Sequence, residues 1–496
     1  MISIYCYEVT MQVTIEHTPK DIVPYGGLPI VGSILKSIGL ANTCNDMPVA
    51  KAHPLNKIEC SDIISTCIAI MCTGQHNFEV CRDFALEQFF IKNALGLVHL
   101  PSAERFRQRL DLIVAESDWK HDVYPRLAQL NQKVIMLYFK ENETGLTPIP
   151  SPLFLDDGQV MHLLPVDIDV TPYDESKSHK EGATVTYKNF IGYAPINAHI
   201  GMEGFMLDTE FRIGKQHCQK DTPEFITETI RYAEPLIKDG QGLLFRLDSG
   251  NDAVDNMAVI MHFGHYFIIK RNLRKESLVD WWELAHNPGT VKHTWADNPA
   301  LASDPSLKED EGLKEGVTRY VGSTWREVTY TNYEGKPCKK TLRIVFEVIE
   351  TTIDEEGQLL LNPKLEVNTW WTNTNYDDKT VIDLYHKHGT MEQYHAELKT
   401  DQTMEKLPSG KFGTNMLIHT LSMIAYNILR LIGYLMNKMV NLPMRGTASR
   451  RRIGTVIKYI IRIPCIIKFH ANRLIADVGG GNPWCGIVCE LQKRLT

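Results

Sequence analysis

Apolar positions in the first part of the chain recur at helical spacing. The stretches GLPIVGSILKSIGL, CSDIISTCIAIMCTG and NFEVCRDFALEQFFIKNALG each carry apolar residues at i, i+3 and i+4, which places them on one face of a helix. The next stretch, PSAERFRQRLDLIVAE, offers Ser102 as an N-cap residue. The pattern predicts a mainly helical N-terminal region.

The middle of the chain changes to short apolar runs that are typical of buried strands. HLLPVDIDV, GLLFRLDSG and HYFIIKRN are such runs, and TVTYKNFIGYAPINAHIG with GFMLDTEFRIG predicts a meander beside the first. TPEFITETIRYAEPLIKDG predicts a helix that ends at Gly240, and a second helix is expected from Asp252 to Phe263. Strand, helix and strand in this order indicate parallel crossovers and an α/β core.

A third pattern begins near Asn272. The segment WADNPALASDPSLKEDEGLKEG is rich in turn formers, and REVTYTNYEG, KKTLRIVFEVIETTID and GQLLLNPKLEV then alternate like hairpin strands.

The longest apolar stretch, Met416 to Val440, contains His419, Asn427 and Arg430. Those polar residues favour a buried helix over a membrane span.

Candidate chemistry lies at the ends of two predicted strands and on one later helix. Asp169 and Asp248 each follow an apolar run, and the carboxyl ends of buried strands are where open α/β sheets bind ligands. In YHKHGTMEQYHAELK, helical spacing places Glu392 in a row with phenol, imidazole and ammonium groups. Two Asp and one Glu can hold two divalent cations for phosphoryl transfer.

Each acid also has a structural interpretation. An Asp at a strand end followed by Thr or Ser-Gly is often turn chemistry alone. Asp167 lies two residues before Asp169 and points to the same face of the strand, so that it could share or replace the metal-binding role. Glu397 is rotated about 140° from Glu392 on an ideal helix and is expected to face solvent.

These residues resemble a known family. The chain is similar to bacterial insertion-sequence transposases of the DDE type, whose group carries a Tyr-x2-Arg-x3-Glu-x6-Lys signature and a β-rich insertion before the Glu. The family's two Asp motifs match Asp169 with Thr171 and Asp248 with Gly250. The signature falls on the following four positions, of which the second departs from the family Arg: Tyr385, His388, Glu392 and Lys399.

The resemblance implies a fold and a mechanism. The fold is α/β, with an RNase H-like (retroviral-integrase-like) catalytic core. Asp169, Asp248 and Glu392 would be the catalytic and metal-binding residues for two Mg²⁺ ions, for which Mn²⁺ could substitute. Signature residues Tyr385, His388 and Lys399 would hold phosphates during cleavage at the terminal inverted repeats and strand transfer into target DNA. A homodimer assembled on double-stranded DNA is implied, in the bacterial cytoplasm and without a membrane partner.

Basic and aromatic residues add candidate DNA contacts. The formal net charge is −7, but the chain from Met444 onward carries ten basic and two acidic residues, a local charge of +8, and such a tail can bind phosphates. The expected DNA contacts are Arg450, Arg451 and Arg452 in the tail, Arg105 and Arg109 on a helix, and Trp370 and Trp371. A solvated tail, an ordinary surface helix and simple packing of the Trp pair stay open as alternatives.

Cysteine usage and the N-terminus bear on the compartment. Eleven cysteines cannot all pair with one another, which favours a reducing environment. No segment combines a basic start, a long apolar run and a cleavage site, so secretion is not expected.

These patterns predict five regions: 1–159, helical and DNA-binding; 160–271, the first part of the core; 272–365, the β-rich insertion; 366–443, the second part of the core with the Glu helix; and 444–496, a helical basic tail. Two other functions share the same acids. One is a metal-dependent nuclease without joining activity, and the other is a catalytically dead, transposase-derived DNA-binding protein, which His388 in place of Arg favours.

Overall fold

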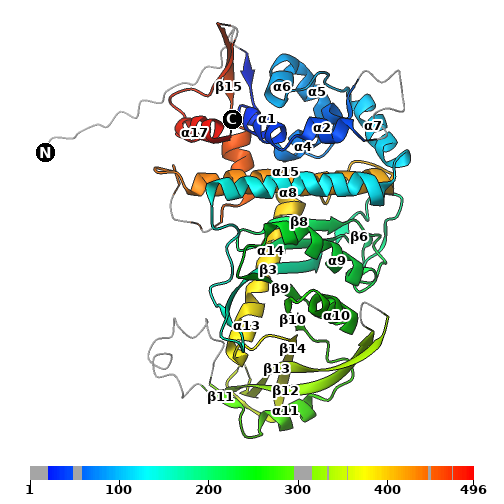
Figure 1. Ribbon diagram of the computed structural model, residues 1–496, viewed down its shortest axis with the longest axis vertical. Helices are drawn as coiled ribbons and strands as arrows, with labels where there is room; N and C mark the ends of the chain where they lie inside the picture. The colour runs from blue at the N-terminus through cyan, green and yellow to red at the C-terminus, as the bar shows by residue number, and fades with distance from the viewer. Residues whose placement is uncertain are drawn as a thin grey trace, which may run out of the picture.

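In a computed structural model of the protein, the chain forms a helical layer, a central sheet and a wide β-extension (Figure 1). The structure describes residues 21–47, 58–294, 315–331, 335–354, 356–444, 448, 450–471 and 473–495. The N-terminal helices and the C-terminal α17 (Cys485–Leu495) lie at one end, and the β-extension lies at the other.

The central sheet is mixed, and its order fits the RNase H-like core that the sequence predicts. The order is β8 (Phe205–Glu210), β7 (Ile196–Ile200), β3 (Val160–Val170), β9 (Gln241–Leu247) and β10 (Tyr266–Lys270). β3, β9 and β10 run parallel, while β7 and β8 form the antiparallel meander. The carboxyl ends of β3 and β9 therefore meet at one edge of the sheet.

Alternate side chains of these strands face two helical layers. Phe245 belongs to the large core formed with helices such as α15 (Phe412–Asn437), whereas Leu244 packs in a second cluster with Val381 of α13 (Asp378–His386). This alternation is the period-2 pattern of a strand that is buried on both faces. The helices that connect the parallel strands are α9 (Thr222–Ala233) and α10 (Val254–His262).

The helix predicted to end at Gly240 stops earlier than expected. α9 ends at Ala233, and a 3-10 turn (Glu234–Leu236) that contains Pro235 follows. Proline has no amide hydrogen and clashes with the preceding turn, so it cannot continue an α-helix.

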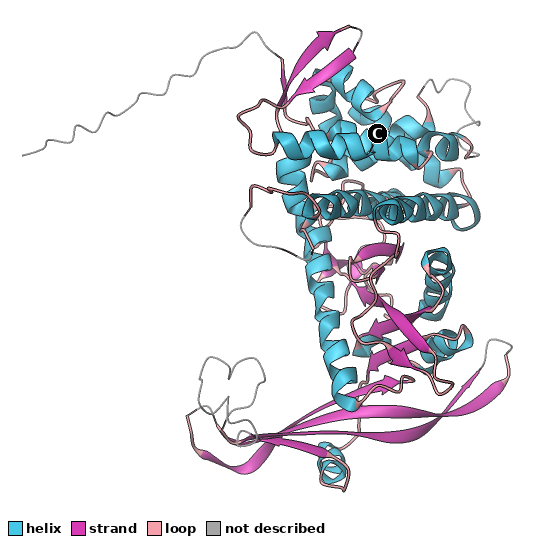
Figure 2. Ribbon diagram, turned by 60° about the vertical axis from the view of Figure 1, so that its left-hand side comes forward, coloured by secondary structure: helices cyan, strands magenta, loops and turns pink. Residues whose placement is uncertain are grey.

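The predicted β-rich segment extends the core sheet rather than forming a separate sheet. β14 (Leu359–Thr372) pairs antiparallel with core strand β10, and β13 (Pro337–Ile353), β12 (Val317–Thr331) and β11 (Val291–Thr294) follow outward. Figure 2 shows these strands as a wide twisted ribbon across the end of the core. Helix α11 (Leu278–Ala285) packs against it.

The N-terminal region is helical, as predicted. Ser102 caps α7, its hydroxyl accepting a bond from the Arg105 amide at 3.4 Å. Helices described in this region are α1 (Leu28–Ser37), α2 (Leu40–Asn45), α4 (Cys60–Cys72), α5 (Val80–Leu86), α6 (Gln88–Leu95), α7 (Ala103–Ala115) and α8 (Tyr124–Glu141). Short strands near the core are β2 (Leu153–Phe154), β4 (Tyr173–Asp174), β5 (Thr184–Val185) and β6 (Ile191–Tyr193).

The prediction of a helical tail is wrong for part of the C-terminal region. A short helix, α16 (Ile453–Val456), is followed by a hairpin of β15 (Cys465–His470) and β16 (Arg473–Asp477). β15 pairs with β1 (Ile22–Val23), near the other end of the chain. This second strand partner of β15 is more than 400 residues away in sequence, so local periodicity could not indicate the pairing.

Helix α15 is long and apolar enough to cross a membrane, yet 94% of its most apolar window is buried within the protein. Its Asn427 also satisfies backbone groups of the edge strand β8. The Met206 amide donates to Asn427 Oδ1 at 2.8 Å, and Asn427 Nδ2 donates to the Met206 carbonyl at 2.7 Å. Asn131 of α8 donates to the same carbonyl at 2.9 Å. The predicted buried helix is therefore confirmed.

We expect Asn427→Leu to lower the free energy of unfolding by about 2–3 kcal/mol, because the Met206 amide would lose its partner in a buried place. Urea unfolding followed by circular dichroism measures this change. The exposed Asn93→Ala is the matched control and should stay within about 0.5 kcal/mol of the wild type. Equal effects of the two substitutions would contradict the role given to Asn427.

Candidate active site

Asp169 and Asp248 lie side by side at the edge where β3 and β9 end. Ile168 of β3 is in register with Leu247 of β9, so the two carboxylates are on the next residue of each parallel strand. The Val170 amide donates to Asp169 Oδ1 at 2.7 Å, and Asn251 Nδ2 donates to Asp248 Oδ1 at 2.8 Å. Both side chains stay partly open to solvent.

The two carboxylates repel each other. Burial, followed by the charge of Asp248, raises the pKa of Asp169 to about 7. A carboxylate pair with this cost of ionisation is stabilised by a bound cation. Carboxylate oxygens are the ligands that Mg²⁺ prefers, so the residues present fit a divalent metal.

A buried ion pair lies directly beneath these carboxylates. Arg246 Nε and Nη2 donate to the two oxygens of Asp167 at 2.7 Å each, and Arg246 Nη1 donates to the Leu384 carbonyl at 2.8 Å. His388 Nδ1 lies 3.0 Å from Asp167 Oδ1. We call Asp167, Arg246 and His388 the buried triad.

The contacts within the buried triad argue against the hypothesis that Asp167 shares the metal-binding role. Burial alone would raise the pKa of Asp167, but the Arg246 charge and the His388 hydrogen bond outweigh it and lower the pKa to about 2. Both of its oxygens already accept hydrogen bonds from the protein. Asp167 is a structural partner of Arg246, and Asp169 is the acid that faces Asp248.

The Glu-bearing segment is not the single regular helix that the sequence predicts. α13 is followed by a 3-10 turn (Lys387–Gly389), α14 (Thr390–Ala396) and a π-helical turn (Glu397–Asp401). Figure 2 shows this segment as a column along the sheet. Because the helical period changes twice, the signature residues do not form one straight row.

The structure separates the four signature positions. His388 lies against Asp167, and the Tyr385 ring lies 5.8 Å from both the Trp370 and the His388 rings between centroids. Burial, then Asp248 and Asp169, raise the pKa of Tyr385. Glu392 is exposed, and Lys399 Nζ lies 3.7 Å from Glu405 Oε1. Among the described residues, no three His, Cys, Asp or Glu side chains converge at metal-binding distance.

His395 faces the acids and was missed by the sequence reasoning. Its Nδ1 lies 3.9 Å from Asp169 Oδ2. Burial, then the charges of Lys399 and His388, lower the pKa of His395 to about 3, so the imidazole is neutral. Its spacing in the sequence could have indicated this position, because His395 is seven residues beyond His388 and three beyond Glu392.

The prediction that Glu397 faces solvent is wrong. Its side chain is 1% exposed and forms ion pairs with Arg430 and with Arg450, the latter at 3.0 Å. The Tyr426 hydroxyl donates to the same carboxylate at 3.0 Å. The π-helical turn that begins at Glu397 and the packing of α15 place it inward, against the direction of an ideal helix.

The predicted DNA-contacting arginines have different environments. Arg105 is exposed, whereas Arg109 is 3% exposed and donates to the Ile58 carbonyl at 3.4 Å, so the structure gives no support to a DNA contact there. Arg450 is held by Glu397, and Arg451 is buried. Arg452 pairs with Asp401 at 2.7 Å but is 54% exposed.

The Trp pair is packed within the protein. Trp370 lies in the cluster with α13, and Trp371 Nε1 donates to Asp252 Oδ1 at 3.0 Å. The Arg271 guanidinium lies 4.9 Å from the Trp371 ring centroid. Both indoles therefore pack the insertion against the core, which is the alternative to base stacking.

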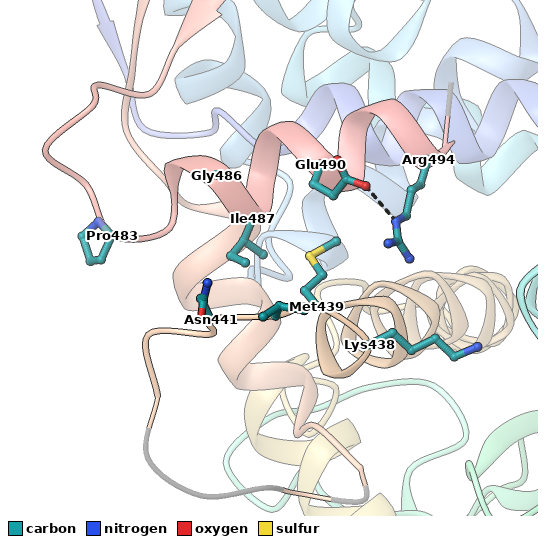
Figure 3. A pocket seen from close by; sticks show the side chains of 9 residues that line it. Lys438, Met439, Asn441, Pro483, Gly486, Ile487, Glu490 and Arg494 are labelled. Carbon is teal, nitrogen blue, oxygen red and sulfur yellow. Dashed lines mark hydrogen bonds and ion pairs between the residues drawn. The ribbon is translucent and has the colours of Figure 1, made fainter.

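A separate pocket lies between the end of α15 and α17 (Figure 3). Lys438 lines one side, and the Glu490–Arg494 ion pair, 3.1 Å long, lines the other. None of the candidate catalytic acids contributes to it.

Comparison with known proteins identifies the family. The family model "Transposase DDE domain group 1" matches residues 9–494. The chain belongs to the DDE transposases. No curated protein matches it significantly. Among solved structures, the transposase is similar to one described as the cryo-EM structure of the piggyBac transposase synaptic complex with hairpin DNA. That similarity has 8% identity and a TM-score of 0.40, and it covers 88% of this chain and 80% of the other.

Family membership and the Asp pair lead to a pH-dependent prediction. The pKa of Asp169 is raised from 3.8 to about 7, so the unfolded chain loses this proton at a lower pH than the folded transposase does, and stability falls as the pH rises through that window. A bound cation offsets this loss. We therefore expect Mg²⁺ to raise the thermal midpoint more at about pH 8 than at about pH 5.5, as measured by differential scanning fluorimetry.

Asp248→Asn is the control for this experiment, because it removes the repulsion. The variant should lose most of the Mg²⁺ response and gain stability at the higher pH without metal. A Mg²⁺ shift of the same size at both pH values would contradict the assignment.

The buried triad predicts a large stability effect. Asp167→Asn leaves the Arg246 guanidinium buried without its counter-charge, and we expect a loss of about 3–5 kcal/mol in the free energy of unfolding. Chemical denaturation measures it. The exposed Asp239→Asn, in the loop before β9, is the matched control and should be close to neutral. A loss below about 1 kcal/mol for Asp167→Asn would contradict the role of the triad.

Proposed function

We propose that this DDE transposase belongs to a bacterial insertion sequence, cleaves DNA at the element's terminal inverted repeats and joins the ends to target DNA. The observation that carries the proposal is the Asp169–Asp248 pair at the edge of the core sheet. Burial and the charge of Asp248 raise the pKa of Asp169, which favours a bound cation beside these carboxylates. Membership of the DDE family supplies the reaction class.

In the proposed mechanism, Asp169, Asp248 and Glu392 would hold two Mg²⁺ ions, for which Mn²⁺ could substitute. Bound divalent ions would activate the attacking oxygen and stabilise the leaving oxygen of a phosphodiester. Water attack breaks the bond between the element and flanking DNA and leaves a 3′-hydroxyl. That hydroxyl then attacks a target phosphodiester, forming one P–O bond as another breaks.

The chain's own residues have distinct parts in this proposal. Tyr385 lies beside the acids, where its hydroxyl can contact a phosphate, and Lys399 can act as a point charge on DNA. His388 is already hydrogen-bonded to Asp167. We therefore propose that it fixes the position of the Glu-bearing segment and does not bind phosphate.

Glu392 is exposed in the free protein and lies just beyond the 3-10 turn Lys387–Gly389. We propose that DNA binding regularises this turn and brings Glu392 to the Asp pair. Because two ends must be cut and joined together, the working form would be a homodimer on DNA, acting in the bacterial cytoplasm.

A second candidate is a DNA-binding protein that has lost catalysis. The exposure of Glu392 and the His at position 388 favour it. A nuclease that cuts without joining would share the acids. Incubation with Mg²⁺ and DNA carrying the element's own inverted repeats separates all three, since each gives a different set of products.

We expect Asp169→Asn, Asp248→Asn and Glu392→Gln each to lower cleavage of end DNA by about a thousandfold or more, because each removes a ligand needed in the transition state. Binding to the same DNA should change little, as measured by fluorescence anisotropy. Gel assays with intact and pre-cut ends report cleavage and joining separately.

Asp239→Asn is the matched control and should keep full cleavage and joining. Cleavage without joining of pre-cut ends would favour the nuclease. Binding without cleavage by the wild type would favour the inactive protein, and full activity in Glu392→Gln would remove Glu392 from the mechanism.

A further inference from the structure

His395 of α14 lies at the candidate metal site without a role in the family signature. Its side chain is 15% exposed, and Nδ1 lies 3.9 Å from Asp169 Oδ2. That distance is too long for a hydrogen bond. Nε2 is buried and has no hydrogen-bond partner among the residues that the structure describes. An imidazole in this position is therefore close to an acid that it does not bond.

The spacing between His395 and Asp169 is suited to a shared cation. Two ligand atoms that each lie about 2.1 Å from one metal ion are roughly 3 to 4 Å apart, depending on the angle between them. The observed 3.9 Å therefore needs only a small adjustment for both atoms to coordinate the same ion. Neutral imidazole is a common metal ligand in proteins.

The helical position of His395 also agrees with a role beside Glu392. Residues three apart on a helix are neighbours on its surface. His395 follows Glu392 by three positions, and α14 contains both. The two side chains are therefore neighbours on α14 and can serve one cation site together.

We propose that His395 is a nitrogen ligand of the divalent cation held by Asp169, and that it strengthens the binding of first-row transition ions such as Mn²⁺ relative to the binding of Mg²⁺. The inference rests on the proposed function, in which the Asp pair binds metal. Imidazole nitrogen binds first-row transition ions, with Mn²⁺ the weakest of the series, whereas Mg²⁺ prefers an all-oxygen shell. The metal preference would therefore be a property of this chain's own sequence.

Pulsed electron paramagnetic resonance of tag-free protein with one equivalent of Mn²⁺ tests the ligand directly, without DNA or turnover. We expect a ¹⁴N hyperfine coupling typical of Mn²⁺-bound imidazole. The coupling should be lost in His395→Ile and in His395→Gln, and it should persist in His386→Ile, a control at an exposed histidine on the neighbouring α13. Absence of nitrogen coupling in the wild type, or its persistence in both His395 variants, would overturn the proposal.

Calorimetric titration gives the second readout. His395→Ile should weaken Mn²⁺ binding by about tenfold or more and Mg²⁺ binding by less than about threefold. Equal losses for the two metals would overturn the ligand role and indicate that the imidazole only orients Asp169. His395→Gln keeps a polar side chain of similar length and guards against a folding defect in the Ile variant.

Asp169→Asn separates a failure of this inference from a failure of the proposed function. If Asp169→Asn abolishes Mn²⁺ binding while the His395 variants bind normally, the Asp pair binds metal and only the His395 assignment falls. If Asp169→Asn binds Mn²⁺ as the wild type does, the metal site of the proposed function is wrong, and the His395 assignment falls with it.

Discussion

The pairing of Asp167 with Arg246 is the interaction on which the candidate site depends. Asp167 lies two residues before Asp169 on β3, and Arg246 lies two residues before Asp248 on β9. Arg246 also holds the Leu384 carbonyl at the end of α13, and His388 adds a bond to Asp167. One buried cluster therefore connects both acid-bearing strands with α13 and the 3-10 turn that precede the Glu392 helix, α14. Two buried charges are costly, but here the carboxylate and the guanidinium satisfy each other through two parallel bonds.

A second buried cluster holds the other end of the same helical segment. Glu397 pairs with Arg430 of α15 and with Arg450 of the C-terminal region. Glu392 lies between the two anchored points, in the part where 3-10 and π turns interrupt the regular helix. Such irregular turns have weaker hydrogen-bond geometry than an α-helix and often mark functional segments. Glu392 itself is on α14, between the two turns, and its side chain is exposed.

Charge compensation also distinguishes the acids from one another. Asp167 and Glu397 are neutralised by arginines, whereas Asp169 and Asp248 face each other without a bonded cationic partner among the described contacts. Burial and the facing charge of Asp248 therefore make the ionisation of Asp169 unfavourable, a cost that a bound cation would offset. His395, neutral and close to Asp169, completes a mixed oxygen and nitrogen environment at this place.

Local pattern in the sequence determined the helical N-terminal region, the core strands, the buried α15 and the β-rich segment, because burial on one or both faces leaves a period of 3.6 or 2. The strand-end positions of Asp169 and Asp248 were readable for the same reason. Only the tertiary structure decided that Asp167 and Glu397 are buried partners, that Glu392 is exposed and that His395 faces Asp169. Their arginine partners lie on other elements, 79 residues away for Asp167 and 33 and 53 for Glu397. An ideal helix could not reveal the turns that change its period. Pairing of β15 with β1 likewise depends on contacts between the two ends of the chain, which no local window of residues contains.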